Sequence, residues 1–155
     1  MNIENVSLWL AGITMLVAIV LYVRARDQRG FDLARRFVYA HVALLTLALG
    51  MLFYLFLADK FQFEYVSHNS SRAQELFYKI SALWAGQEGT FLLWAWIIGI
   101  LAIFVMRRGG EYLRWAMIYL LATQAFLLIL MYVRSPFALI EGAIPADGNG
   151  LFHLP

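Results

Sequence analysis

The residue types best suited to binding or chemistry gather in one short segment, between residues 84 and 94. The segment reads Trp-Ala-Gly-Gln-Glu-Gly-Thr-Phe-Leu-Leu-Trp, so a single carboxylate lies among two glycines and two tryptophans. Glycine allows close backbone approach and positive φ, and tryptophan offers a broad apolar wall. This combination favours a bend against which another helix or a binding partner packs. The candidate binding surface consists of Trp84, Gly86, Gln87, Glu88, Gly89 and Trp94.

Simpler explanations exist for the same residues. A carboxylate in the first turn of a helix interacts favourably with the helix dipole, by about 0.3–1 kcal/mol, which accounts for Glu88 alone. Tryptophans near the ends of apolar helices form the aromatic belt of membrane proteins. Trp94 and Trp96 lie deeper and on nearly opposite sides of the expected helix, so one would face a bound group and the other lipid. Both interpretations stay open.

Histidine matters next, because membrane haem is commonly held by two histidines on facing helices. Only His41 lies within a long apolar run, whereas His68 and His153 lie outside these runs. A histidine inside a membrane span is a candidate functional residue. Next to an arginine-rich loop it is better explained as a packed or interfacial side chain. No metal site is expected, and His41 and His68 are the weak candidates for ligation.

Several classes of chemistry are excluded. The chain has no cysteine, so it has no disulfide, no thiolate metal site and no cysteine nucleophile. No Ser/His/Asp set, phosphate-binding loop or metal-spaced His/Glu pair is present, and the carboxylates are scattered in the expected loops. The net charge of +2 is too small to indicate a nucleic-acid partner. No residue is therefore assigned a catalytic role.

Composition places these residues in a membrane protein, since 63% of the chain is hydrophobic and only 14% is charged. Four runs without Asp, Glu, Lys or Arg are long enough to cross about 30 Å of hydrocarbon. Backbone groups in lipid must be hydrogen-bonded internally, so these runs predict helices, and the alternation of a β-barrel is missing. The runs are Val6–Val23, Phe37–Ala58, Thr90–Met106 and Trp115–Val133.

The expected fold is an all-α integral membrane protein with four transmembrane helices arranged as two antiparallel hairpins. In the central loop, Ser71 and Gln74 fit a capping box, and the apolar positions from Leu76 to Trp84 share one helix face. This pattern predicts an interfacial amphipathic helix next to the third span. The tail is rich in turn residues and is expected to lack regular structure. The segments are residues 1–58 (first hairpin), 59–89 (outer loop), 90–133 (second hairpin) and 134–155 (outer tail).

Charge asymmetry sets the expected orientation. Cytoplasmic loops of membrane proteins carry an excess of Lys and Arg. The two short links hold eight arginines, against four basic residues in the other loops. Both termini and residues 59–89 are therefore expected on the outer face, which is periplasmic for a bacterial inner membrane. The eight arginines are Arg24, Arg26, Arg29, Arg35, Arg36, Arg107, Arg108 and Arg114.

The stretch from Tyr78 to Trp94 resembles the CcmF/NrfE family of haem lyases in cytochrome c maturation. That family carries Tyr-Lys-Ile-x-Ala-x-Trp-Gly-Gly-His-Glu-Gly-Ser-Leu-Leu-Leu-Trp, and this chain aligns with it without a gap. Residues 63–70 resemble the family's outer-loop segment around Tyr-Val-Ala-x-His-Ser-Asn. Residues 135–137 and 145–151 resemble its Asn-Pro-Phe and Pro-Ala-Asp-Gly-x-x-Leu segments. Spacing and hydropathy agree with the family over nearly the whole chain. The match is to the N-terminal part of the family's longer proteins.

The resemblance implies a role in the last step of cytochrome c biogenesis, in which members join haem to a Cys-x-x-Cys-His apocytochrome on the outer face. The family's haem-ligand histidines and tryptophan-rich segment lie beyond the part that this chain matches. Gln87 also replaces the family's usual histidine before Glu-Gly, which weakens any ligand role there. Residues 152–155 depart from the family pattern, so His153 is not carried over to a family ligand.

The preferred hypothesis is a cytochrome c maturation component, a haem-lyase-like module that handles haem with other subunits and performs no chemistry alone. The expected partners are other maturation subunits, apocytochrome c and membrane lipid, and haem would be bound only with partner chains. The alternative is a non-catalytic structural subunit of a larger respiratory or photosynthetic complex. A transporter is a weaker third class, since broken helices and intramembrane charges are missing.

Overall fold

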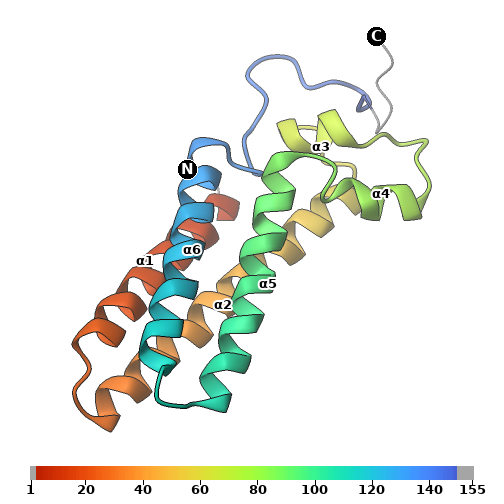
Figure 1. Cartoon of the computed structure of the whole chain (residues 1–155). Helices are drawn as coiled ribbons and strands as arrows, with labels where there is room; N and C mark the ends of the chain where they lie inside the picture. The colour runs from red at the N-terminus through yellow and green to blue at the C-terminus, as the bar shows by residue number, and fades with distance from the viewer. Residues whose placement is uncertain (1–2, 150–155) are drawn as a thin grey trace.

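The computed structural model describes residues 3–149, with side-chain environments from residue 5 onward. Within this range the regular secondary structure is all helical, and one isolated antiparallel bridge joins Phe63 and Leu139. Four long helices form an elongated bundle, and two short helices gather at one end of it (Figure 1). The helices are α1 (Ile3–Arg24), α2 (Gln28–Leu57), α3 (Glu64–Asn69), α4 (Leu76–Ala82), α5 (Gln87–Arg108) and α6 (Leu113–Val133).

The four long helices are each long and apolar enough to cross a membrane, which confirms the expected all-α class with four spans. The second helix is longer than expected, because α2 begins at Gln28 and not at Phe37. Asp27 caps it, and its carboxylate accepts a hydrogen bond from the Gly30 N–H at 3.0 Å. A helix of 30 residues is about 45 Å long, so its first, arginine-bearing turns extend past the hydrocarbon.

Small residues hold the bundle together. In lipid the hydrophobic effect does not drive helices together, so close packing of small side chains takes its place. α1 packs on α2 and α6, and α5 packs on α2 and α6. Leucine and methionine side chains fill the space between these small residues, and other large apolar side chains point outward, as expected of a lipid-facing surface. The fully buried alanines of the four long helices are Ala11, Ala18, Ala34, Ala48, Ala95 and Ala102.

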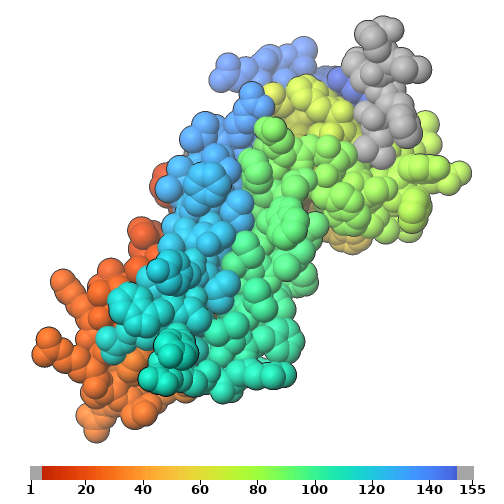
Figure 2. Space-filling view, viewed as in Figure 1, coloured from red at the N-terminus to blue at the C-terminus, as the bar shows by residue number. Residues whose placement is uncertain are grey.

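The two ends of the bundle differ. The arginine end holds the short links between α1 and α2 and between α5 and α6, where Gly109 and Gly110 turn the chain with φ of 67° and 112°. The loop end holds α3, α4 and residues 134–149, and the molecule broadens there (Figures 1 and 2). The starts of α1 and α5 and the end of α6 also lie at the loop end (Figure 1).

The central loop contains more structure than the sequence predicted. Helix α3 was not expected, and α4 begins only at Leu76 after Glu75. The capping box was wrong as a helix start. The Ser71 N–H does donate to Gln74 Oε1 at 3.2 Å, but the contact closes a turn ahead of α4. A turn can use the same reciprocal side-chain bond as a helix, which is why the pattern misled.

The tail has no helix over residues 134–149, as expected, yet it is firmly attached to the central loop. The Ile140 N–H donates to the Gln62 carbonyl at 3.0 Å, and the Asn149 N–H donates to the Ser67 carbonyl at 2.8 Å. The backbone N–H of Arg72, and then that of Gly148, lowers the pKa of the Asp147 carboxyl. His153 and the end of the segment that resembles the family lie outside the described residues.

Candidate functional site

A buried tyrosine organises the loop end. Tyr65 of α3 is 5% exposed, and its hydroxyl donates to the Leu83 carbonyl at 3.0 Å, just after α4. The same oxygen accepts the Gly86 N–H at 3.1 Å, at the start of α5. Burial raises the pKa of this phenol to about 12, so it keeps its proton at any physiological pH. One side chain therefore fixes α3, α4 and α5 relative to each other.

The two glycines of the motif are explained by this tyrosine. A Cβ on Gly89 would lie 1.8 Å from the Leu83 carbonyl oxygen and 2.5 Å from the Tyr65 hydroxyl. A Cβ on Gly86 would lie 2.7 Å from Cε2 of the same ring. Gly86 is the N-cap of α5 with φ −109°, so the expected bend is the cap and first turn of a helix. The glycines provide close approach, and neither needs a positive φ.

A short ion pair joins α4 to the end of α2. Lys79 Nζ lies 2.5 Å from Asp59 Oδ1, and the lysine side chain is only 10% exposed. Asp59 adopts φ +49°, which turns the chain as α2 ends. Lys79 belongs to the segment that resembles the family, but its spacing alone gave no sign of its partner 20 residues earlier. Sequence reasoning therefore missed this contact as well as Tyr65.

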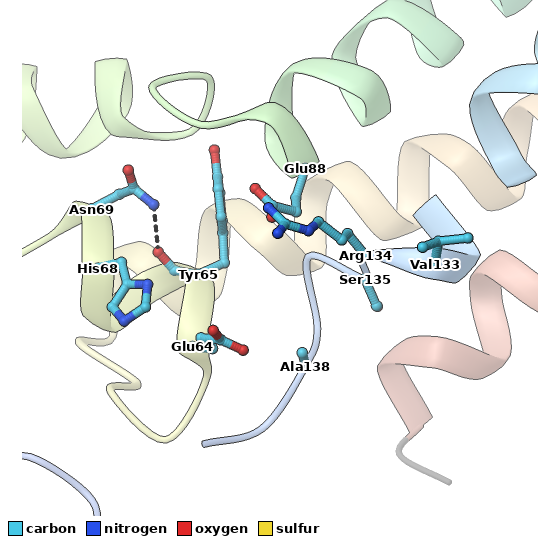
Figure 3. A pocket seen from close by; sticks show the side chains of 9 residues that line it. All are labelled: Glu64, Tyr65, His68, Asn69, Glu88, Val133, Arg134, Ser135 and Ala138. Atoms are coloured by element: carbon cyan, nitrogen blue, oxygen red, sulfur yellow. Dashed lines mark hydrogen bonds between the residues drawn. The ribbon is translucent and has the colours of Figure 1, made fainter. Parts of the chain in front are cut away.

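A polar pocket of about 410 Å³ opens beside this assembly. Its charged side chains come from α3, from the first turn of α5 and from the end of α6, and they surround one hollow (Figure 3). In the pocket wall, Asn69 Nδ2 donates to the Tyr65 carbonyl at 2.9 Å. The lining residues are Glu64, Tyr65, His68, Asn69, Glu88, Val133, Arg134, Ser135 and Ala138.

An apolar groove of about 400 Å³ lies between α2, α4 and α5. Its main polar groups bond to one another, because Trp96 Nε1 donates to Thr46 Oγ1 at 2.9 Å. Gly50 contributes open space, since a Cβ there would meet nothing within 4 Å. The lining residues are Thr46, Leu49, Gly50, Phe53, Ile80, Leu83, Trp84, Gly89, Leu93 and Trp96.

The structure distributes the candidate residues between these two surfaces. Trp84 and Gly89 line the apolar groove, whereas Glu88 lines the polar pocket. Gln87 is exposed. Trp94 is 55% exposed on α5 and lines neither the pocket nor the groove, as expected of a lipid-facing residue. The segment from Trp84 to Gly89 therefore lies between two sites of opposite polarity, and we call it the ridge.

The histidines lie apart. His41 is completely buried in the bundle, where its Nδ1 lies 2.9 Å from the Ala11 carbonyl oxygen. It lines neither the polar pocket nor the apolar groove. His41 is thus packed inside the bundle in this chain, and its place as a weak candidate for ligation stays a prediction. His68 is exposed on α3 and faces the polar pocket. Among the described residues no group of three or more His, Cys, Asp or Glu could hold a metal ion.

These surfaces do not fit haem by themselves. Haem needs apolar walls together with an axial ligand to iron. The apolar groove offers walls without a histidine, and the polar pocket offers His68 within mainly polar walls. Within the described part of the chain, a haem would therefore lack either its ligand or its apolar environment.

Comparison with known proteins supports the motif-based reading. The chain is 35% identical over 130 residues to cytochrome c-type biogenesis protein CcmF of Pseudomonas aeruginosa, which covers 81% of this chain. It is 30% identical over 124 residues to CcmF of Haemophilus influenzae, and 31% identical over 111 residues to NrfE of the same organism. A solved structure described as cytochrome c haem lyase CcmF superposes with a TM-score of 0.81 at 25% identity, over 90% of this chain.

The chain belongs to the CcmF family. It spans about 20% of the Pseudomonas CcmF and 25% of the solved CcmF chain. No sequence-family model matches it. The family and the four apolar helices together make this a multi-pass membrane protein.

Proposed function

We propose that this chain is a component of cytochrome c maturation, which contributes to haem handling and cytochrome c assembly together with other subunits. The observation that carries the proposal is the match between the family motif and the most constrained part of the molecule. The motif segment from Tyr78 to Trp94 supplies Lys79, both close-approach glycines and residues of both surfaces. A subunit that only packed against other membrane helices would not need the buried ion pair, the two close-approach glycines and the two surfaces.

The loop end is the working face in this proposal, and it lies on the outer side of a bacterial inner membrane. The arginine end supports this orientation, because cytoplasmic loops are enriched in basic residues. On the outer side, Leu76 and Phe77 of α4 are 60% and 73% exposed, so α4 lies in the membrane interface. The polar pocket then faces the periplasm and the apolar groove faces the outer leaflet.

Labelling single cysteines tests the orientation directly, because the natural chain has none. Glu141→Cys lies in the exposed tail at the loop end, and Glu111→Cys lies in the exposed link at the arginine end. A membrane-impermeant maleimide added to intact cells should label Glu141→Cys, and should label Glu111→Cys only after the membrane is permeabilised. The reverse pattern would place the loop end in the cytoplasm and overturn the proposed working face.

In this proposal the ridge and its two surfaces contact partner chains, namely other maturation subunits and apocytochrome c. Any ligand to haem iron comes from such a partner in this proposal, since neither surface of the described residues combines a histidine with apolar walls. The proposed contact residues are Trp84, Gly86, Gln87, Glu88 and Gly89, with Trp94 facing lipid or a neighbouring helix.

Deletion of the gene tests the function. We expect covalently haem-stained c-type cytochromes in membranes to fall, and the tagged wild-type chain to restore them and to co-purify with maturation subunits. Glu88→Gln and Arg134→Gln, in the polar pocket, should restore cytochrome less well, whereas Arg108→Gln at the arginine end should restore it fully. Unchanged cytochrome levels with co-purification of a respiratory complex would support the structural-subunit alternative instead.

A further inference from the structure

Two buried polar side chains meet at the centre of the membrane bundle. His41 of α2 and Gln124 of α6 are both 0% exposed. Each is hydrogen-bonded to a backbone carbonyl of the preceding helix in its own pair. His41 Nδ1 lies 2.9 Å from the Ala11 carbonyl oxygen of α1, and Gln124 Nε2 donates to the Ala95 carbonyl of α5 at 2.8 Å.

These two hydrogen bonds determine which atoms of His41 and Gln124 are left without a partner. A carbonyl oxygen only accepts, so the ring proton of neutral His41 must be on Nδ1, and Nε2 carries a lone pair. The Gln124 amide is oriented by Ala95, which leaves Oε1 as its free atom. Both His41 Nε2 and Gln124 Oε1 are buried without a hydrogen-bond partner. The Gln124 side chain lies within hydrogen-bonding reach of the imidazole, although no bond of normal geometry joins the two free acceptors.

No rearrangement of the neutral groups removes the conflict. Moving the ring proton to Nε2 would satisfy Gln124 Oε1 but leave Nδ1 facing the Ala11 carbonyl, and turning the Gln124 amide would set its oxygen against the Ala95 carbonyl. The groups that contact the ring from α1 and α6 are uncharged, and no ionisable side chain acts on it electrostatically. Buried acceptors are nearly always satisfied, because each unsatisfied one is costly.

We propose that a hydrogen-bond donor bridges His41 Nε2 and Gln124 Oε1, and that this bridge joins the α1–α2 pair to the α5–α6 pair. The donor is either one internal water molecule, which has two O–H groups for the two acceptors, or a second proton on the ring. Either source completes one chain of hydrogen bonds that crosses all four long helices. The bridge then sets how the two helix pairs are aligned in the membrane.

A double-mutant cycle on the full chain in lipid nanodiscs tests the bridge. His41→Asn keeps a donor where Nδ1 lies and removes Nε2, and Gln124→Leu removes the carboxamide. If the bridge exists, the double variant should lose less thermal midpoint than the sum of the single losses, by about 2–4 °C. Thr123→Leu, at an exposed position of the same helix, is the control and should combine additively with His41→Asn. Additivity for the Gln124 pair as well would overturn the proposal.

Nitrogen NMR of the wild-type chain, labelled with ¹⁵N-histidine, identifies the donor without relying on a variant to fold. The chain has three histidines, and the signal absent from His41→Asn assigns His41. A proton on Nδ1 alone, with Nε2 shifted by hydrogen bonding, indicates the water. Protons on both nitrogens indicate the charged ring. An Nε2 signal typical of an unbonded lone pair would contradict the bridge. A proton on Nε2 alone would also overturn the proposal, because Nδ1 could then not donate to Ala11 and the chain of hydrogen bonds across the four helices would be broken.

Discussion

The loop end and the arginine end of this bundle are built in different ways. At the loop end, specific contacts fix each segment, including the buried Tyr65 hydroxyl, an ion pair of 2.5 Å and backbone bonds to the tail. At the arginine end, two glycines turn the chain, and the ion pair between Arg35 and Asp32 measures 3.5 Å with side chains 39% and 60% exposed. The loop end is held in a defined shape by specific contacts, whereas the arginine end mainly presents positive charge.

One arginine is an exception that sharpens the contrast. Arg114 donates to the Ala25 carbonyl and lies 5.2 Å from the ring centroid of Phe31. It connects the start of α6 to the link between α1 and α2, so this side chain crosses the bundle at the arginine end. The remaining arginines of this end are exposed or only partly covered, as expected for groups that interact with lipid headgroups. Substitutions should therefore cost far more at the loop end.

The largest effect is expected for Gly89→Ala. Its Cβ would lie 1.8 Å from the Leu83 carbonyl oxygen, which is backbone and cannot rotate away, so α4 and α5 must separate. We expect the free energy of unfolding to fall by about 2–3 kcal/mol. Gly50→Ala is the matched control, since a Cβ there meets nothing within 4 Å. The control should be neutral or slightly stabilising. Chemical denaturation in detergent micelles measures both, and equal losses would refute the close-approach explanation.

Asp59→Asn should have the next largest effect. The substitution leaves the ammonium of Lys79 only 10% exposed and without its carboxylate. Asparagine tolerates the positive φ of this position, so the change removes charge without adding backbone strain. A fully buried pair broken in this way costs about 3–5 kcal/mol, and partial exposure of Asp59 reduces the expectation to about 1–3 kcal/mol. If Lys79→Met in the same background restores the stability, the loss came from the unpaired charge.

Tyr65→Phe should cost about 1–2 kcal/mol, because it removes one donor and one acceptor and leaves the Leu83 carbonyl and Gly86 N–H unsatisfied. Tyr119→Phe, at a side chain 72% exposed, is the control.

The raised pKa of the Tyr65 phenol also leads us to expect that the free energy of unfolding depends on pH. Its pKa is near 10 unfolded and about 12 folded, so its contribution is complete below pH 10 and is lost as the pH rises to 12. The stability difference between wild type and Tyr65→Phe should shrink over that window.

How much of this was predictable from the sequence depends on the range of the interaction. The four helices follow from apolar runs, because lipid leaves the backbone of such a run no alternative. The motif identified the glycines and Glu88, but it could not show that Tyr65, 21 residues before Gly86, is their partner. Nor could it show that Trp84 and Glu88 face different cavities. Those facts depend on how the short helices α3 and α4 fold back, and no local periodicity encodes that.

The smallest effect is expected at the arginine end, for Arg35→Gln. This substitution breaks the ion pair with Asp32, but both partners are exposed, so water solvates each charge once the pair is lost. Such surface pairs contribute about 0.2–1 kcal/mol, and the i,i+3 spacing on one helix places this one at the low end. We expect an unfolding midpoint within error of wild type, and a further decrease of the small effect in high salt. A loss as large as that of Asp59→Asn would mean that the arginine end is as firmly built as the loop end, and would remove the structural reason for placing the working face at only one of them.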